Sequence, residues 1–402
     1  MKSTCLKALL AFATLAVASP ALFTPGPGSG QQVVLNGQRF DAHSGTVEGF
    51  SLDLDEKRLV QLEDQDPMWM TELEKIQLKA LGIKFFDVTD AQDLGSNAAL
   101  RAKSTPIYPA LSAHEQVTSV IKTLSTDGPR ANLEKFTSFR TRYYKSETGR
   151  QSQEWLLSKV KEVAAEAASP SMQSIISIEE FEHSWGQHSI VARINGASDD
   201  NRIVIIGAHQ DSTNMWPYLP APGADDDGSG TVTILEAYRA LLAADFHPER
   251  PVEFHWYSGE EGGLLGSQAI AKSYEAQGLE VYAMSQYDMT AWVKKGTREE
   301  VGIIVDFVDD SLTKVNKQLV DAYLDIPWAD TKCGYACSDH APWSKAGYPS
   351  IFTMESTFPN ANSGNIHTAN DRIDISDEFS FSHMLEFSKL AVAFAIELGG
   401  SI

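Results

Sequence analysis

The chain has 402 residues, of which 43% are hydrophobic and 22% charged, close to the averages for globular proteins. This composition argues against a disordered, collagenous or coiled-coil protein, and the length suits one large α/β domain with an appendage. The formal net charge of -21 argues against nucleic acid or an anionic membrane as a partner, because both repel an acidic protein. Three cysteines are too few for a scaffold built on disulfides.

Residues 1–18 predict a secretory signal. Lys2 and Lys7 precede an apolar run over residues 8–17, and Ala16 and Ala18 form the small-x-small pattern that signal peptidase accepts. A membrane anchor is the alternative, but the apolar run is shorter than the ~20 residues of a membrane span. We therefore expect a secreted, extracellular protein.

Residues 19–97 differ in composition from the rest of the chain. Their central stretch is acidic, and they contain one histidine, His43, and no cysteine. Apolar residues at helical spacing over 72–81 predict a short helix, and the run at 83–90 predicts a strand. A second functional domain is the alternative, but a segment so poor in reactive side chains, ahead of a catalytic unit in a secreted chain, favours a propeptide.

Residues 98–402 alternate between helical and strand patterns. The expected elements are helices over 117–124 and 155–163, strands over 188–196 and 202–212, a helix over 231–244, a strand over 251–258, a helix over 264–276, strands over 280–288 and 300–308, a helix over 315–320, a strand over 348–355 and a closing helix over 379–398. This succession predicts one α/β domain with a mixed, mostly parallel central sheet and helices on both faces.

Ionisable residues follow several of these strands, at the sheet edge where open α/β folds bind their ligands. Each of these residues, considered by itself, has a simple structural explanation, such as an Asp that caps a helix or a Glu that is solvated. Together, crowded carboxylates would repel each other unless cations neutralise them, which points to a metal site. The candidate ligands are His209, Asp226, Glu261, Asp288 and His367.

Imidazole and carboxylate ligands without thiolate suit Zn²⁺. A bridging carboxylate would leave each of two ions one histidine, one terminal carboxylate and an open position for water. Two ions roughly 3.5 to 4 Å apart activate a shared water and polarise a carbonyl, which is the chemistry of amide hydrolysis. Asp211, two residues after His209, is placed to accept the second ring N–H of that histidine. Glu260 points away from its neighbour Glu261 and is free to act as general base.

Six motifs in this order, GAHQDS, PGADDDGSG, YSGEEGGLLGSQ, YDMT, CGYACSDHAPW and IHTAND, resemble those of the secreted leucine aminopeptidases of fungi and bacteria. The resemblance covers roughly residues 97–402 and implies the zinc-dependent exopeptidase fold with two zinc ions per chain. It implies that Asp226 bridges the ions and that Glu260 is the base. His209 and Asp288 would complete one zinc site, and Glu261 and His367 the other.

The resemblance also implies a non-proline cis peptide bond between Asp226 and Asp227 and a removable propeptide. It places Tyr335 near the open metal position, where the hydroxyl group would help to stabilise the tetrahedral intermediate. Tyr335 stands between Cys333 and Cys337, which we expect to form a disulfide in an oxidising compartment. Metal binding by the cysteine pair is the alternative.

Apolar residues near these motifs are candidates for a pocket that takes the first side chain of a peptide, and Leu, Met or Phe would suit it. Ordinary core packing explains them equally well. They are Met289, Ile304, Phe352, Met354, Phe358 and Ile366. The expected partners are peptides with a free, hydrophobic N-terminus, and a monomer is expected because no exposed apolar stripe stands out.

Two other functions remain open. The same fold also carries single-metal acyltransferases such as glutaminyl cyclase, which would cyclise an N-terminal Gln. A non-catalytic receptor-like ectodomain is the second alternative, and it would be expected to have lost ligands. The complete set of five candidate ligands favours the peptidase over both.

Overall fold

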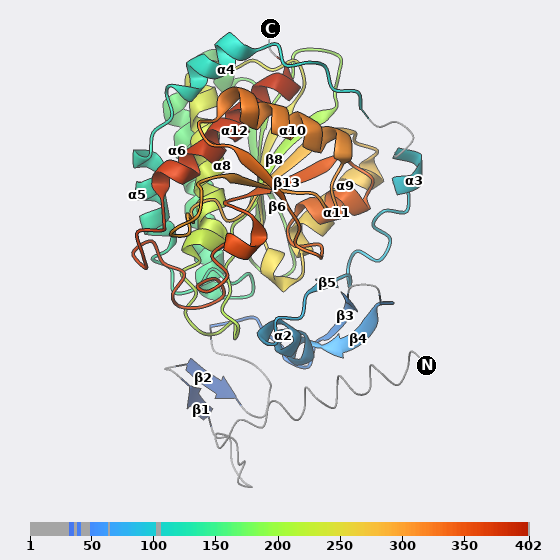
Figure 1. Ribbon diagram of the computed structural model, residues 1–402. Coiled ribbons are helices and arrows are strands. Elements are labelled where there is room, and N and C mark those ends of the chain that lie inside the picture. The colour runs from blue at the N-terminus through green and yellow to red at the C-terminus, as the bar shows by residue number, and fades with distance from the viewer. Residues whose placement is uncertain (1–31, 36–37, 42–48, 63–64, 102–105, 401–402) are drawn as a thin grey trace.

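The computed structural model describes residues 32–35, 38–41, 49–62, 65–101 and 106–400, so the expected signal at 1–18 lies outside the described residues. Figure 1 shows a large main domain, residues 106–400, with a small N-terminal unit, residues 49–62 and 65–87, packed against one end of it. Residues 88–101, which include helix α3 (Ala98–Arg101), run along the side of the main domain. Strands β1 (Gln32–Leu35) and β2 (Gln38–Asp41) form a separate antiparallel pair. In the part of the chain that the structure describes, no helix is both long and apolar enough to cross a membrane.

The main domain is built on a sheet of eight strands in the order β12-β11-β13-β10-β8-β9-β7-β6. Its strands are β6 (Ile176–Phe181), β7 (Ser189–Ile194), β8 (Ile203–His209), β9 (Val252–Tyr257), β10 (Val281–Tyr287), β11 (Val301–Ile304), β12 (Trp328–Thr331) and β13 (Ser350–Met354). The central strands β13, β10, β8 and β9 run parallel, while β6, β7 and the β11–β13 pair are antiparallel. The mixed, mostly parallel sheet that the sequence predicts is therefore confirmed.

Helices cover both faces of this sheet, which is why the central strands are buried along their whole length. One face carries α4 (His114–Ile121), α5 (Asp127–Phe136), α6 (Glu147–Ala167), α7 (Pro170–Gln173), α8 (Gly230–Ala243), α10 (Asp310–Tyr323) and α12 (Phe381–Gly399). The other face carries α9 (Leu265–Gln277) and α11 (His340–Lys345), and Figure 1 shows the two groups on opposite sides.

Some elements differ from the sequence-based expectation. The apolar run over 300–308 predicts one strand, but β11 ends at Ile304 because the chain turns there, and Phe307 adopts a positive φ of 57°. The edge strands β6 and β12 are not predicted, since both carry acidic residues that break the apolar pattern. Helix α6 runs for 21 residues, well beyond the predicted 155–163.

The N-terminal unit is a three-stranded sheet with one main helix. Its elements are β3 (Lys57–Leu62), β4 (Met68–Thr71), α2 (Glu72–Ala80) and β5 (Phe85–Asp87), and α3 (Ala98–Arg101) follows against the main domain. The predicted helix is α2, which begins with a capping box between Thr71 and Glu74. The predicted strand is β5, whereas β3 and β4 are not predicted. Ion pairs dock the unit on the main domain, including Lys145 with Glu56 at 2.6 Å.

Candidate active site

The strand register brings ionisable residues to one edge of the sheet. Strands β8, β9 and β10 are parallel neighbours, so their carboxyl ends lie side by side. His209, the last residue of β8, pairs with Tyr257 of β9. Gly207 pairs with Gln286 of β10, which places Asp288 beside the end of β8. The turn after β9 supplies Glu260 and Glu261 to the same edge.

The loop before α8 supplies three consecutive aspartates, and each of their carboxylates contacts different groups. The carboxylate of Asp227 accepts the backbone N–H groups of His209 and Met289, both at 3.1 Å. The carboxylate of Asp225 accepts the N–H of Ala291 at 3.1 Å. Asp226 instead turns towards two histidines, and the peptide bond between Asp226 and Asp227 is cis, as the resemblance implies.

The five candidate ligands meet around Asp226. One of its oxygens, Oδ1, lies 3.2 Å from Nε2 of His209, which is 3.7 Å from Oδ1 of Asp288. The other oxygen, Oδ2, lies 3.0 Å from Nε2 of His367, which is 3.2 Å from Oε2 of Glu261. The arrangement is thus two groups of three residues, each compact enough to hold a metal ion, that share one carboxylate.

Unpartnered polar atoms show that these residues suit bound cations. Nε2 of His209, Oδ1 of Asp288 and Oε1 of Glu261 are buried without a hydrogen-bond partner among the described residues. A buried polar atom without a partner is costly, so atoms converging in this way fit ligands of a metal ion. The nitrogen and oxygen donors, with no thiolate among them, are those that Zn²⁺ accepts in catalytic sites.

The electrostatics of the cluster agree with this fit. Burial tends to raise the pKa of Asp226, but the neighbouring imidazoles of His209 and His367 outweigh it and hold that pKa well below its usual range. Burial would lower the pKa of His367, yet Glu261 and Asp226 raise it to about 9. The carboxylates therefore draw positive charge to this point in the molecule.

Asp211 contributes differently from the sequence-based expectation. The closest acceptor for Nδ1 of His209 is the backbone oxygen of Asp211 at 3.1 Å, while the Asp211 carboxylate lies 3.5 Å away. That carboxylate accepts the backbone N–H groups of Glu260 and Glu261, at 3.1 and 3.2 Å. Asp211 is thus a positioning residue that holds the glutamate turn against the end of β8.

Glu260 lines the cavity beside the cluster, and its carboxylate is not part of either three-residue group. Burial raises the pKa of Glu260 well above its usual range, His209 opposes this shift, and Glu261 adds to it. A carboxyl group with a raised pKa next to the cluster has the properties of a general acid–base group.

An apolar cavity of about 290 Å³ opens next to the cluster. Five of the six expected pocket residues line it, namely Met289, Phe352, Met354, Phe358 and Ile366. Ile304 does not line the cavity, because it is fully buried and packs behind Met289, Phe352 and Met354. The pocket interpretation therefore fits five residues, and ordinary core packing fits the sixth.

The loop after β12 closes one side of the cavity. A disulfide joins Cys333 to Cys337, and Tyr335 between them lines the cavity. Burial and the carboxylates of the site, first among them Glu260, raise the pKa of Tyr335. Its hydroxyl group therefore stays protonated and available as a hydrogen-bond donor.

Three residues of the site are not predicted from the sequence. Asp371 accepts the backbone N–H groups of Asp225 and Asp226, at 2.9 and 3.0 Å, and Ser338 donates to Asp288 at 2.6 Å. Asp371 lies in the motif IHTAND and Ser338 in the motif CGYACSDHAPW, and this position in a motif is the only sequence signal that could have found them. Lys79 of the N-terminal unit also reaches the site, where it pairs with the Glu261 carboxylate.

Comparison with known proteins identifies the class to which this fold and site belong. The model of peptidase family M28 matches residues 189–392, and the chain belongs to that family. The chain is therefore a metallo-aminopeptidase, a hydrolase of peptide bonds.

Two fungal relatives and one solved structure are closely similar. Leucine aminopeptidase 1 of Coccidioides posadasii is 48% identical over 86% of this chain and 90% of its own length. Leucine aminopeptidase 1 of Phaeosphaeria nodorum is 49% identical over 85% of this chain and 88% of its own. The crystal structure of the Legionella pneumophila LapA aminopeptidase has a TM-score of 0.75 and 29% identity, and it covers 86% of this chain and 99% of its own.

Proposed function

We propose that this protein is a secreted aminopeptidase that uses two zinc ions to remove an N-terminal Leu or other hydrophobic residue from peptides. The observation that carries the proposal is the sharing of Asp226 between two groups of histidine and carboxylate ligands, beside an apolar cavity. The curated relatives at 48 and 49% identity are named leucine aminopeptidases, which supports the preference for Leu.

In this proposal Asp226 would be a ligand of both ions. His209 and Asp288 complete one site, and Glu261 and His367 complete the other. When bound, the ions would activate a water molecule and polarise the carbonyl group of the substrate.

The protein's own residues carry the proton. Glu260 takes a proton from water as the water oxygen bonds to the carbonyl carbon of the substrate. It then returns that proton to the leaving nitrogen as the C–N bond breaks, so the products are a free amino acid and a shortened peptide. The Tyr335 hydroxyl donates a hydrogen bond to the carbonyl oxygen as negative charge develops there.

Specificity follows from the open metal position and the shape of the site. The free α-amine of the substrate, once it has lost its proton, would bind at the open metal position of the site, and an N-acetylated peptide lacks this group. The apolar wall formed by Met289, Phe352, Met354, Phe358 and Ile366 takes the first side chain.

We also propose that residues 1–18 are a signal and residues 19–97 a propeptide, and that the mature enzyme is a monomer. Five residues of the N-terminal unit line the same cavity as Glu260, which supports an enzyme precursor that is activated by cleavage. They are Lys79, Gly82, Ile83, Lys84 and Phe85. A cut near residue 97 would leave α3 on the main domain, where Arg101 pairs with Glu275 at 3.1 Å.

A paired assay tests the activity. The mature protein should hydrolyse leucine p-nitroanilide and leave N-acetyl-leucine p-nitroanilide intact, because the acetyl group removes the free amine. Equal cleavage of the two would rule out an aminopeptidase. Cyclisation of an N-terminal Gln peptide, with neither anilide cleaved, would instead support the glutaminyl cyclase alternative.

A further inference from the structure

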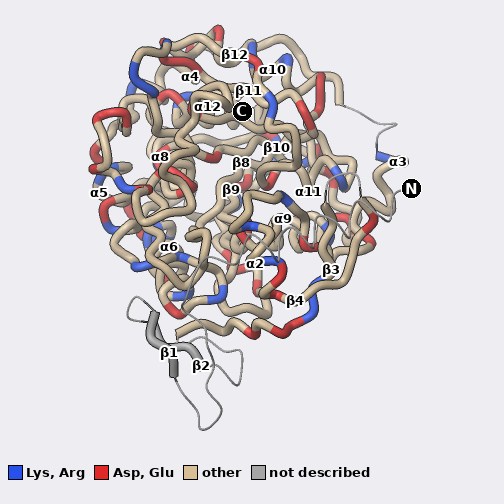
Figure 2. The backbone as a smooth tube through the Cα atoms, turned by 60° about the horizontal axis from the view of Figure 1, so that its bottom comes forward, with Lys and Arg blue, Asp and Glu red and all other residues tan. Residues whose placement is uncertain are grey.

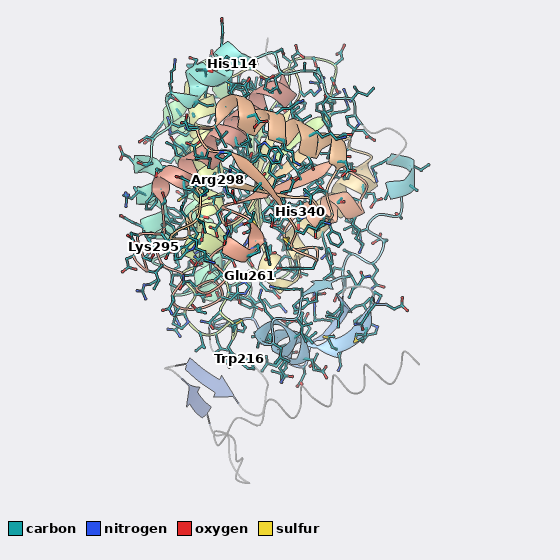
Figure 3. The ribbon with its side chains drawn as sticks, viewed as in Figure 1. His114, Trp216, Glu261, Lys295, Arg298 and His340 are labelled. Atoms are coloured by element: carbon teal, nitrogen blue, oxygen red, sulfur yellow. A yellow bond between two sulfur atoms is a disulfide. The ribbon has the colours of Figure 1, made fainter. Side chains whose placement is uncertain are left out.

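The N-terminal unit places a lysine on one of the two ligand groups. Lys79, near the end of α2, donates to the backbone oxygen of Glu261 at 2.9 Å and pairs with Oε2 of the same glutamate. Figure 3 labels Glu261 at the end of the main domain that faces α2 of Figure 1. Oε2 is the same oxygen that lies 3.2 Å from Nε2 of His367. The ammonium group therefore binds directly to a ligand atom.

Helix α2 is held in place by further contacts around this lysine. One turn earlier, Lys75 is fully buried, donates to Asp87 at 2.9 Å, and contacts the backbone oxygen of Gly262 at 3.3 Å. Gln268 of the main domain donates to the backbone oxygen of Asp87 at 3.0 Å. Basic and acidic segments adjoin where α2 meets the main domain in Figure 2. These bonds fix the helix and direct Lys79 at Glu261.

The contact involves one ligand group and not the other. Glu261 belongs to the group with Asp226 and His367, whereas His209 and Asp288 form the second group with the shared Asp226. A lysine ammonium carries one positive charge, so it neutralises part of the acidic cluster and repels a divalent ion that approaches the same oxygen.

We propose that Lys79 acts as an internal cation that keeps zinc out of the Asp226–Glu261–His367 site until the N-terminal unit is removed. This inference rests on the proposed two-zinc function and adds its regulation. The full chain then binds one zinc ion, at His209, Asp226 and Asp288, and takes up the second only when Lys79 leaves. Cleavage would thus complete the metal centre as well as open the cavity.

Lys84 offers a matched control on the same unit. It lines the same cavity, and its Nζ lies over the ring of Tyr335 at 5.1 Å from the centroid. Its cation–π contact is with an aromatic ring and not with a ligand oxygen. Removing its charge should therefore leave the number of bound zinc ions unchanged.

Zinc binding to the full chain tests the proposal without depending on activity. Wild type, Lys79→Met, Lys79→Gln and Lys84→Met are stripped with a chelator and dialysed against buffered micromolar Zn²⁺, and bound zinc is measured by atomic emission. We expect about one ion per chain for wild type and Lys84→Met, and about two for both Lys79 variants. Thermal unfolding of each variant checks that it is folded. Two different substitutions at position 79 keep the test usable if one of the two variants does not fold.

A second ligand variant shows which site is filled. In the full chain with Lys79 present, His367→Ala should leave the bound zinc unchanged. Combined with Lys79→Met, it should lower the bound zinc from about two ions per chain to one. If wild type binds two ions as tightly as Lys79→Met, the inference about Lys79 is wrong and the two-zinc proposal stands. If folded Lys79 variants and the cleaved mature protein all bind a single ion, the two-zinc proposal fails and this inference fails with it.

Discussion

Asp225, Asp226 and Asp227 are chemically identical, yet each carboxylate has a different set of partners. Asp225 and Asp227 accept backbone N–H groups and hold loops in place, whereas Asp226 faces His209 and His367. Sequence spacing locates the cluster and makes Asp226 a candidate ligand, and the resemblance implies its bridging role. Its partner Asp371, 145 residues away, acts through backbone contacts that no local pattern encodes.

Glu260→Gln tests the proton transfer at this scale. The amide has nearly the same shape as the carboxylate, but it does not accept a proton, so kcat should fall by about 100- to 10,000-fold. Because Glu260 belongs to neither ligand group, the bound zinc should not change. Steady-state kinetics and metal analysis of the same preparation check both points, and near-normal turnover would exclude Glu260 as the base.

At the scale of elements, the site is built from parallel strands and from a short loop that a disulfide closes. The parallel strands β8, β9 and β10 are rich in β-branched and aromatic residues and are fully buried, so the sequence predicts them and the residues at their ends. Strands β3, β4, β6 and β12 are not predicted, because partly exposed polar residues interrupt their patterns. The disulfide between Cys333 and Cys337 then fixes the loop that carries Tyr335.

Replacing both cysteines by serine tests the role of this loop. A cross-link over so short a loop contributes only about 2 kcal/mol to stability, so the melting temperature should fall by a few degrees. KM for leucine p-nitroanilide should rise, because Tyr335 and the cavity wall are held less firmly. A lower melting temperature with unchanged KM and kcat would show that the disulfide only stabilises the fold.

At the scale of the whole molecule, two units meet over one cavity. The main domain supplies all five candidate ligands, and the N-terminal unit adds Lys79, Lys84 and Phe85 to the cavity wall. Composition separates the two units in the sequence, because the first has few reactive side chains. The contact of Lys79 with Glu261 spans 182 positions and depends on how the units dock, so no sequence pattern predicts it.

Anomalous X-ray scattering at the zinc edge from crystals of the mature protein tests the central claim most directly. The account predicts two peaks roughly 3.5 to 4 Å apart, with the Asp226 carboxylate between them. His209 and Asp288 should contact one peak, and Glu261 and His367 the other. A single peak, or peaks remote from Asp226, would contradict it.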